Sequence, residues 1–256
     1  MLEIRVIPIL TIYGKGLYRT KAFKKPSYVG DPINSVKLFN DKEVDELIVL
    51  DITGGCWSDD DFKTFEEIAK YAFMPLAYGG RVSKLEHVKK IFKAGYEKVI
   101  LNTAAHSDYS LISEIAQMYG SQSVIVSIDI KRSFFKKHPV LYVNNGKKKL
   151  NISYINAAVA AEKAGAGEII IRSIDKDGMM DGYDIDLITE LKNKVSIPIV
   201  LAGGAGNLEH LREAIDNGAH SVAAGSMFVY QGRHRAVLIN YPSRKILKEN
   251  NLVYRK

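Results

Sequence analysis

The segment "PLAYGGRVSKLEHVKKIFKAGYEKVI" at residues 75–100 decides the fold, because the chain repeats it at residues 198–223 as "PIVLAGGAGNLEHLREAIDNGAHSVA". A shift of 123 residues aligns the two initial prolines, Gly80 with Gly203, and the two "LEH" triplets. Each copy has a short apolar run, a glycine-rich turn, a segment of helical periodicity and a second apolar run. The repeat therefore predicts that two βα units are duplicated within the chain.

Eight short runs rich in β-branched residues are spread along the chain, and segments of helical periodicity separate them. The helical segments 85–95 and 208–218 end at Gly95 and Gly218, where glycine suits the left-handed cap of a helix. Eight such units predict an α/β fold, a (β/α)8 TIM barrel with internal half-barrel duplication. The expected strands lie at residues 3–12, 46–53, 75–79, 98–102, 123–130, 168–174, 197–202 and 221–225.

The whole chain, residues 1–256, is expected to form one barrel domain, since no linker or change of composition divides it. The half-barrels span about 1–120 and 121–240, and a helix and tail follow at 241–256. The single cysteine, Cys56, excludes an internal disulfide and fits a reducing compartment. No apolar run approaches the roughly 20 residues of a membrane span. The start of the chain shows no signal-peptide cleavage pattern, so we expect a cytoplasmic protein.

The chain is basic, with a formal net charge of +7. This charge favours anionic partners such as phosphate esters, and a lysine-rich solvated surface explains it equally well. The basic stretch after the fifth strand contains "VLYVNNGKKK" at 140–149, which predicts a hairpin in that loop. We expect no nucleic-acid partner.

Glycine-rich turns follow four of the expected strands in two matching pairs. The loops after the third and fourth strands hold Gly80, Arg81, Asn102 and Thr103, and those after the seventh and eighth hold Gly203, Gly204, Gly225 and Ser226. Glycine lets backbone N–H groups approach an anion, and a hydroxyl adds a donor. Tight-turn geometry alone would explain one pair. Two pairs in register predict two phosphate cradles, and hence a phosphorylated small-molecule substrate with a phosphate at each end.

Acidic residues end three of the expected strands, and catalysis in such barrels takes place at these carboxyl ends. Asp51, Asp129 and Asp175 are candidates for a general base, and helix capping is the alternative for each. The repeat places Thr11 of the first strand opposite Asp129 of the fifth. The six histidines show no metal-ligand spacing, so we expect neither a metal nor another cofactor.

Four charged residues stand where strands begin, at the opposite end of the barrel. They are Arg5, Glu46, Lys98 and Glu168. Together they could close the barrel with ion pairs. The residues alone favour separate solvated pairs.

Seven motifs together resemble one known family, the HisF family, which is the cyclase subunit of imidazole glycerol phosphate synthase. They are "GDPI", "DELIVLDIT", "LNTAA", "GSQSVIVSIDIKR", "GAGEIIIRSIDKDG", "DGYD" and "GGAGNLEH". The resemblance runs from about residue 3 to 230. It implies a two-phosphate barrel that takes ammonia from a separate HisH-like glutaminase subunit at its amino-terminal face. It also implies that the four charges form the gate of an ammonia channel.

The family's reaction uses a general acid on strand one and a general base on strand five. With ammonia it converts a phosphoribulosyl-formimino substrate into imidazole glycerol phosphate and an aminoimidazole carboxamide ribotide. The resemblance assigns the base to Asp129, and the position of the acid is occupied by Thr11. A threonine hydroxyl cannot exchange a proton near neutral pH as a carboxyl group does, and losing a general acid typically costs about 10²–10⁴-fold in rate.

Other departures from the family gather near the same end of the barrel. Arg19 stands where the family usually has lysine, Arg81 replaces a glycine, and Arg172 and Met179 replace threonines. Arg172 shares strand parity with Glu168, so its side chain is expected to point into the barrel.

Three hypotheses follow. A divergent barrel subunit delivers ammonia to another acceptor, as in sugar amidation for surface polysaccharide, with a third amidotransferase protein as a possible partner. Alternatively, the chain is a working histidine-pathway cyclase in which water or a neighbour replaces the acid. As a third alternative, it is a non-catalytic conduit that activates a glutaminase. A stand-alone sugar isomerase is the weakest reading, because it needs the strand-one acid and no gate.

Overall fold

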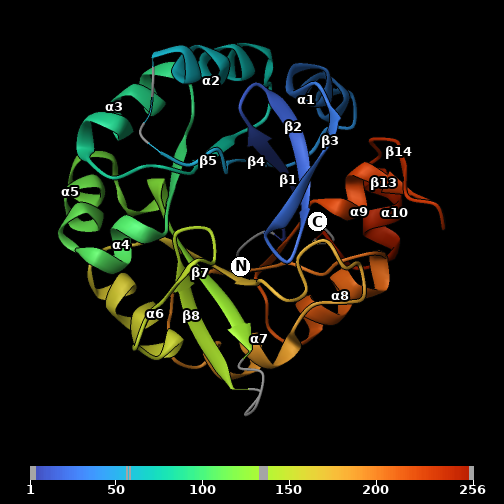
Figure 1. Ribbon diagram of the computed structural model, residues 1–256. Helices are drawn as coiled ribbons and strands as arrows, with labels where there is room; N and C mark the ends of the chain where they lie inside the picture. The colour runs from blue at the N-terminus through green and yellow to red at the C-terminus, as the bar shows by residue number, and fades with distance from the viewer. Residues whose placement is uncertain (1–3, 56, 58, 133–137, 254–256) are drawn as a thin grey trace.

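The computed structural model describes residues 4–55, 57, 59–132 and 138–253, and Cys56 lies outside this part of the chain. Eight parallel strands close into a barrel, in which β1 pairs with both β4 and β12 and β7 pairs with β10 (Figure 1). This confirms the predicted (β/α)8 barrel. The barrel strands are β1 (Val6–Tyr13), β4 (Leu47–Asp51), β5 (Leu76–Gly79), β6 (Lys98–Leu101), β7 (Val124–Arg132), β10 (Glu168–Ser173), β11 (Ile199–Ala202) and β12 (Ser221–Ala224).

Helices surround the barrel in a ring (Figure 1). Gly95 and Gly218 adopt φ of 110° after the helices of the repeated segments, which confirms the predicted helix ends. None of the helices in the described residues is both long and apolar enough to cross a membrane. The helices are α1 (Pro32–Asp41), α2 (Asp59–Tyr71), α3 (Leu85–Ala94), α4 (Thr103–Ser107), α5 (Ser110–Tyr119), α6 (Tyr154–Lys163), α7 (Ile185–Leu191), α8 (Leu208–Asp216), α9 (Ser226–Val229) and α10 (Arg244–Glu249), with the 3-10 turn η1 (Ser121–Ser123).

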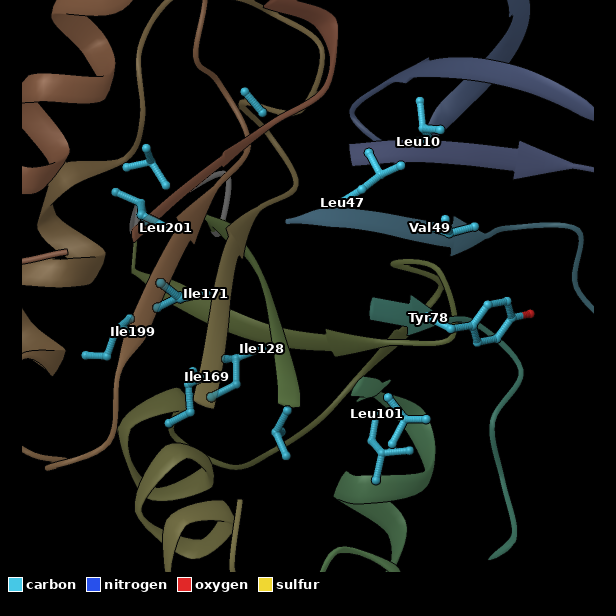
Figure 2. Packing of buried hydrophobic residues seen from close by; sticks show 14 of the residues in the cluster. Leu10, Leu47, Val49, Tyr78, Leu101, Ile128, Ile169, Ile171, Ile199 and Leu201 are labelled. Carbon is cyan, nitrogen blue, oxygen red and sulfur yellow. The ribbon is translucent and has the colours of Figure 1, made fainter. Parts of the chain in front are cut away.

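Alternate residues of each strand build two separate cores, because successive side chains point to opposite faces. Outward-facing residues such as Leu10, Val49 and Ile171, labelled in Figure 2, belong to one buried cluster with residues of the surrounding helices. The inward-facing residues form a second cluster inside the barrel, which includes Ile7 and Ile170. The barrel interior is therefore aliphatic at mid-height.

Two hairpins extend the barrel at its carboxyl-terminal end. The predicted hairpin after the fifth strand is confirmed by β8 (Pro139–Val143), which pairs with β7, and β9 (Lys148–Lys149). The hairpin of β2 (Gly16–Lys21) and β3 (Lys24–Gly30) was not predicted. Ala22 and Phe23 at its turn have φ of 49° and 59°. A turn with positive φ at both central residues normally contains Asn-Gly or a similar pair. The Ala-Phe pair found here therefore did not indicate a hairpin. A short third hairpin joins β13 (Tyr230–Gln231) and β14 (Ala236–Val237).

Candidate functional site

The lumen of the barrel has three levels along its axis. On β1, Ile7 and Ile9 belong to the inner aliphatic cluster, and Thr11 lies beyond them at the carboxyl-terminal mouth. Arg5 precedes them with the same strand parity and forms part of a charged ring at the amino-terminal end. The levels are therefore a charged ring, an aliphatic layer and a polar mouth, in that order.

The charged ring joins all four residues that were expected at the amino-terminal end. Lys98 Nζ lies 2.8 Å from Glu46 Oε2 and 3.4 Å from Glu168 Oε2. The Arg5 guanidinium donates to the same two carboxylates. Burial alone would lower the pKa of Arg5, and the charges of Glu168 and Glu46 outweigh it, so this pKa lies above its ordinary value. The expectation of separate solvated pairs was wrong, because closure of the barrel brings four strand starts within reach of one another.

The aliphatic layer lies directly on the carboxyl-terminal side of the ring. Its members come from every strand of the barrel, and several are small. They are Ile7, Ile9, Ile48, Ala77, Ile100, Ile125, Ile170, Val200, Ala202 and Ala223, with Leu50 packed against them. A layer of this kind gives an ion no polar partner.

Asp129 is a buried carboxylate at the centre of the mouth. Its Oδ1 accepts a hydrogen bond from Ser127 Oγ at 3.0 Å, and its Oδ2 accepts one from Asn102 Nδ2 at 3.3 Å. Burial raises the pKa of Asp129, and the positive charge of Arg172 and the Ser127 hydrogen bond oppose this shift. A carboxylate with a raised pKa that lines a cavity has the properties of a general base. The role assigned to Asp129 stays a prediction.

The raised pKa of Asp129 makes stability depend on pH in a defined direction. The folded state holds the Asp129 proton more tightly than the unfolded chain does, so protonation of Asp129 stabilises the fold. This stabilisation is complete below the ordinary pKa of 3.8 and is lost as pH rises through the pKa of the folded state. Asp129→Asn removes this loss. We expect the difference in unfolding free energy, variant minus wild type, to increase as pH rises from about 4. Urea denaturation at a series of pH values measures this difference. A constant difference at all pH values would contradict the shift.

Asp51 anchors an arginine on the first-cradle side of the mouth. Its Oδ2 accepts from Arg81 Nε at 2.6 Å and from the Tyr78 hydroxyl at 3.2 Å, and its Oδ1 accepts from the backbone N–H of Thr53 at 2.9 Å. Arg81 Nη1 also pairs with Asp61 at 3.0 Å. Both carboxylate oxygens of Asp51 therefore already accept hydrogen bonds from groups of the protein. The catalytic role expected for Asp51 and the phosphate-binding role expected for Arg81 stay predictions, and this geometry favours a structural pair.

The first cradle surrounds an open cavity of about 860 Å³. The four residues expected to form it, Gly80, Arg81, Asn102 and Thr103, all line this cavity. Thr103 Oγ1 accepts from the backbone N–H of Asn144 at 3.0 Å, so the β8–β9 hairpin closes one side. Gly80 and Asn102 also line a neighbouring cavity of about 340 Å³ that contains Asp51, Asp129 and Arg172. The cradle and the centre of the mouth thus share walls.

Gly80 is expected to tolerate no side chain. Its φ is +114°, and a Cβ there would lie 2.1 Å from the carbonyl oxygen of Asp51. We expect Gly80→Ala to lower the unfolding free energy by at least about 3 kcal/mol in urea denaturation, because both backbone strain and a backbone clash oppose it. Gly14→Ala is the control, since its φ is +59° and nothing lies within 4 Å. The control should cost about 1 kcal/mol, and equal losses would contradict the close-approach argument.

The second cradle is nearly filled. Gly203, Gly204, Gly225 and Ser226 come together as expected, around a cavity of only about 10 Å³. The side chain of Arg19 lies over Gly225, where a Cβ would be 1.9 Å from its Nη2. Arg19 Nη1 donates to Thr11 Oγ1 at 3.1 Å and to the carbonyl of Ile9 at 3.2 Å. Burial lowers the pKa of Arg19, and the charge of Asp177 opposes this.

The loop after β10 places two acids in different surroundings. Asp175 accepts the backbone N–H of Arg132 at 2.7 Å and is not among the residues lining the three cavities. Its expected catalytic role stays a prediction. Asp177, which the sequence reasoning missed, is buried, accepts from Thr20 Oγ1 at 2.9 Å and pairs with Arg172 at 3.8 Å. The second aspartate of "DKDG" was the available signal for it.

Arg172 points into the mouth, as its strand parity predicted. It lines the same cavity as Asp129, and its guanidinium lies 4.1 Å above the ring of Phe23 from the β2–β3 hairpin. Among the described residues, no group of three or more histidine, cysteine, aspartate or glutamate side chains is arranged to hold a metal ion.

Comparison with known proteins relates residues 5–235 to the family described as "Histidine biosynthesis protein". A Pseudomonas aeruginosa protein provisionally named imidazole glycerol phosphate synthase subunit hisF2 is 46% identical over 94% of this chain and 97% of its own length. A Leptospira interrogans protein with a provisional HisF name is 42% identical over 96% and 97%. Imidazole glycerol phosphate synthase subunit HisF of Dictyoglomus thermophilum is 38% identical over 89% and 90%.

Proposed function

Because the chain belongs to the histidine biosynthesis protein family and has HisF subunits among its relatives, we propose that it is the barrel subunit of a glutamine amidotransferase complex. In this proposal a HisH-like glutaminase docks at the amino-terminal face and releases ammonia there. The ammonia passes through the barrel to an acceptor at the carboxyl-terminal mouth. The site of action is cytoplasmic, which is consistent with a chain that has one cysteine.

The observation that carries the proposal is the alignment of the charged ring with the aliphatic layer behind it. The ring of Arg5, Glu46, Lys98 and Glu168 closes the lumen at one end. The aliphatic layer connects it to the cavity that holds Asp129. Ammonia is small and neutral in its reactive form. Entering an apolar layer therefore costs ammonia less free energy than it costs a hydrated ion. From the resemblance to HisF, we propose that this arrangement acts as a gated channel.

An exposed aromatic residue supports the proposal that the glutaminase docks at the amino-terminal face. Phe73 lies in the loop that precedes β5, and the residue is 88% exposed. Exposed aromatic side chains of this kind are typical anchors of protein interfaces. Docking here would place the outlet of a glutaminase next to the charged ring.

The acceptor is proposed to differ from the substrate of the histidine pathway. Thr11 cannot supply the general acid of the cyclase reaction, and its hydroxyl already accepts a hydrogen bond from Arg19. We assign the chain to amidation of a sugar for surface polysaccharide, with the final transfer made here or by a third amidotransferase protein. Substitutions at the reacting end beside an intact ring support a changed acceptor.

Asp129 favours a second candidate function, a working cyclase of histidine biosynthesis. It lines the central cavity, is hydrogen-bonded by Ser127 and Asn102, and has a raised pKa. In this candidate, water or a neighbouring group replaces the missing acid. A non-catalytic conduit that only activates the glutaminase is the third possibility, and cyclase turnover would exclude it.

The proposal is tested by glutamine hydrolysis with a HisH-type glutaminase from the same genome, measured with and without this protein. We expect a one-to-one complex and faster hydrolysis. Phe73→Ser should weaken the complex about tenfold or more. Tyr28→Ser, which alters an aromatic residue 62% exposed on the hairpin at the opposite end, should leave affinity unchanged. Absence of any complex with wild type would contradict the proposal.

A further inference from the structure

We infer that Arg19 closes the second cradle permanently, so that the barrel accepts ligands with one anionic end, a single phosphoryl or carboxylate group, held in the first cradle. The inference rests on the proposed function in taking the carboxyl-terminal mouth as the ligand site. It departs from the two-phosphate substrate that the repeated loops predict.

The space left in the two cradles differs by far more than the sequence repeat suggests. The cavity at the first cradle has a volume of about 860 Å³, and the one at the second has about 10 Å³. A cavity of roughly 10–15 Å³ by this measure holds one water molecule. A phosphoryl group with its three terminal oxygens does not fit there while Arg19 stays in place.

Arg19 is held in the cradle from two sides. Its guanidinium donates to Thr11 Oγ1 and to the carbonyl of Ile9, and 6% of the residue is exposed. The next residue, Thr20, donates to Asp177, and the backbone N–H of Ala22 donates to the Asp177 carbonyl at 2.9 Å. These contacts fix the hairpin against the loop after β10, so withdrawing Arg19 requires the hairpin to move.

Polar atoms in the small cavity fit a single water better than an anion. Arg19 Nε and Ser226 Oγ are both buried without a hydrogen-bond partner, and both residues line this cavity. One water can satisfy both atoms within the space available. Asp177, which also lines the cavity, supplies a negative charge beside Arg19 and Arg172. A carboxylate already in the site disfavours a second anion there.

Thr11 and Arg19 therefore act as one unit. The threonine hydroxyl serves as an acceptor for the guanidinium, and the guanidinium fills the cradle that a substrate phosphate would need. The same pair that removes the general acid removes one of the two phosphate sites. Half of the mouth, next to β1, β11 and β12, is thereby closed to ligand.

The test is the crystal structure of the full chain, determined from crystals soaked in inorganic phosphate, for wild type and Arg19→Ala. We expect no phosphate at Ser226 in wild type, with Arg19 still bonded to Thr11, and phosphate at Ser226 in Arg19→Ala. Phosphate bound between Arg19 and Ser226 in wild type would overturn the inference. So would an Arg19→Ala structure whose emptied cradle stays free of phosphate.

Calorimetry supplies a second readout, with ribulose 5-phosphate and ribulose 1,5-bisphosphate as probes. Wild type should bind the two within about threefold, and Arg19→Ala should prefer the bisphosphate by about tenfold or more. Arg212→Ala, at an exposed arginine of α8, is the matched control and should behave as wild type. If Arg19→Ala does not fold, Arg19→Met keeps the aliphatic stem, removes the guanidinium that lies over Gly225, and should show the same preference for the bisphosphate. A wild-type preference of tenfold for the bisphosphate would contradict the closure.

Failure of this inference is separable from failure of the proposed function. Glutaminase docking takes place at the opposite face and is measured by hydrolysis of glutamine. Phosphate binding at Ser226 with normal glutaminase activation would overturn the closure alone. Loss of glutaminase binding with an empty wild-type second cradle would overturn the proposed function alone.

Discussion

Replacing Arg5 by alanine is expected to lower the unfolding free energy by about 3 kcal/mol, because it leaves two buried carboxylates with one cation between them. Glu46 and Glu168 have side chains only 3% and 6% exposed, and Arg5 pairs with both. Lys98 would then be their only cationic partner among the described ring residues. Most of this loss is the free-energy cost of leaving a buried negative charge unpaired, because the net stabilisation by the ion pairs themselves is small.

Urea denaturation near neutral pH measures this effect, and two comparisons define it. Arg212→Ala breaks an exposed pair, with side chains 54% and 68% exposed, and should cost less than about 1 kcal/mol. Adding Glu168→Gln to Arg5→Ala should recover part of the stability, since it removes one of the stranded charges. If the double variant is less stable than Arg5→Ala, the ring is not an electrostatic unit.

The double variant Thr11→Asp with Arg19→Lys is expected to turn over the phosphoribulosyl-formimino substrate about 10²–10⁴-fold faster than wild type, whose own rate should not exceed the Asp129→Asn background. The aspartate restores the general acid that the resemblance to HisF places on strand one. The lysine is the residue usual in that family, and it vacates the space over Gly225. Thr11→Asp alone should gain less, because the Arg19 guanidinium would hold the new carboxylate ionised and lower its pKa.

The rate of product formation with saturating ammonium salt measures this gain. Arg19→Lys alone opens the cradle without supplying an acid, so its rate should stay near that of wild type. Adding Asp129→Asn to the double variant should remove the gain, because the assigned base is lost. A double variant no faster than wild type would show that the deficit does not lie at Thr11.

The barrel could be predicted from sequence because its signals are local and repeated. The eight strands are short apolar runs, and the matching segments at 75–100 and 198–223 reveal the duplication directly. The inward direction of Arg172 followed from strand parity alone. The family resemblance added the roles proposed for the ring and for Asp129.

The contacts between distant segments could not be predicted. The β2–β3 hairpin turns at Ala22 and Phe23, which carry no turn signal, and it delivers Arg19 into a cradle formed by the distant loops after β11 and β12. The pairing of Asp51 with Arg81 likewise depends on the left-handed backbone of Arg81, with φ of 57°. The residue patterns alone did not join the four charges into one ring, because that contact depends on closure of the barrel; only the family resemblance implied it.

The most direct test of the account measures whether the wild-type protein still catalyses the cyclase reaction. Wild type and Asp129→Asn are given the phosphoribulosyl-formimino substrate with saturating ammonium salt at alkaline pH, so that no glutaminase is needed. The account predicts no turnover by folded wild type above the Asp129→Asn background. Wild-type turnover that Asp129→Asn abolishes would contradict it, and would identify a histidine-pathway cyclase that works without the strand-one acid.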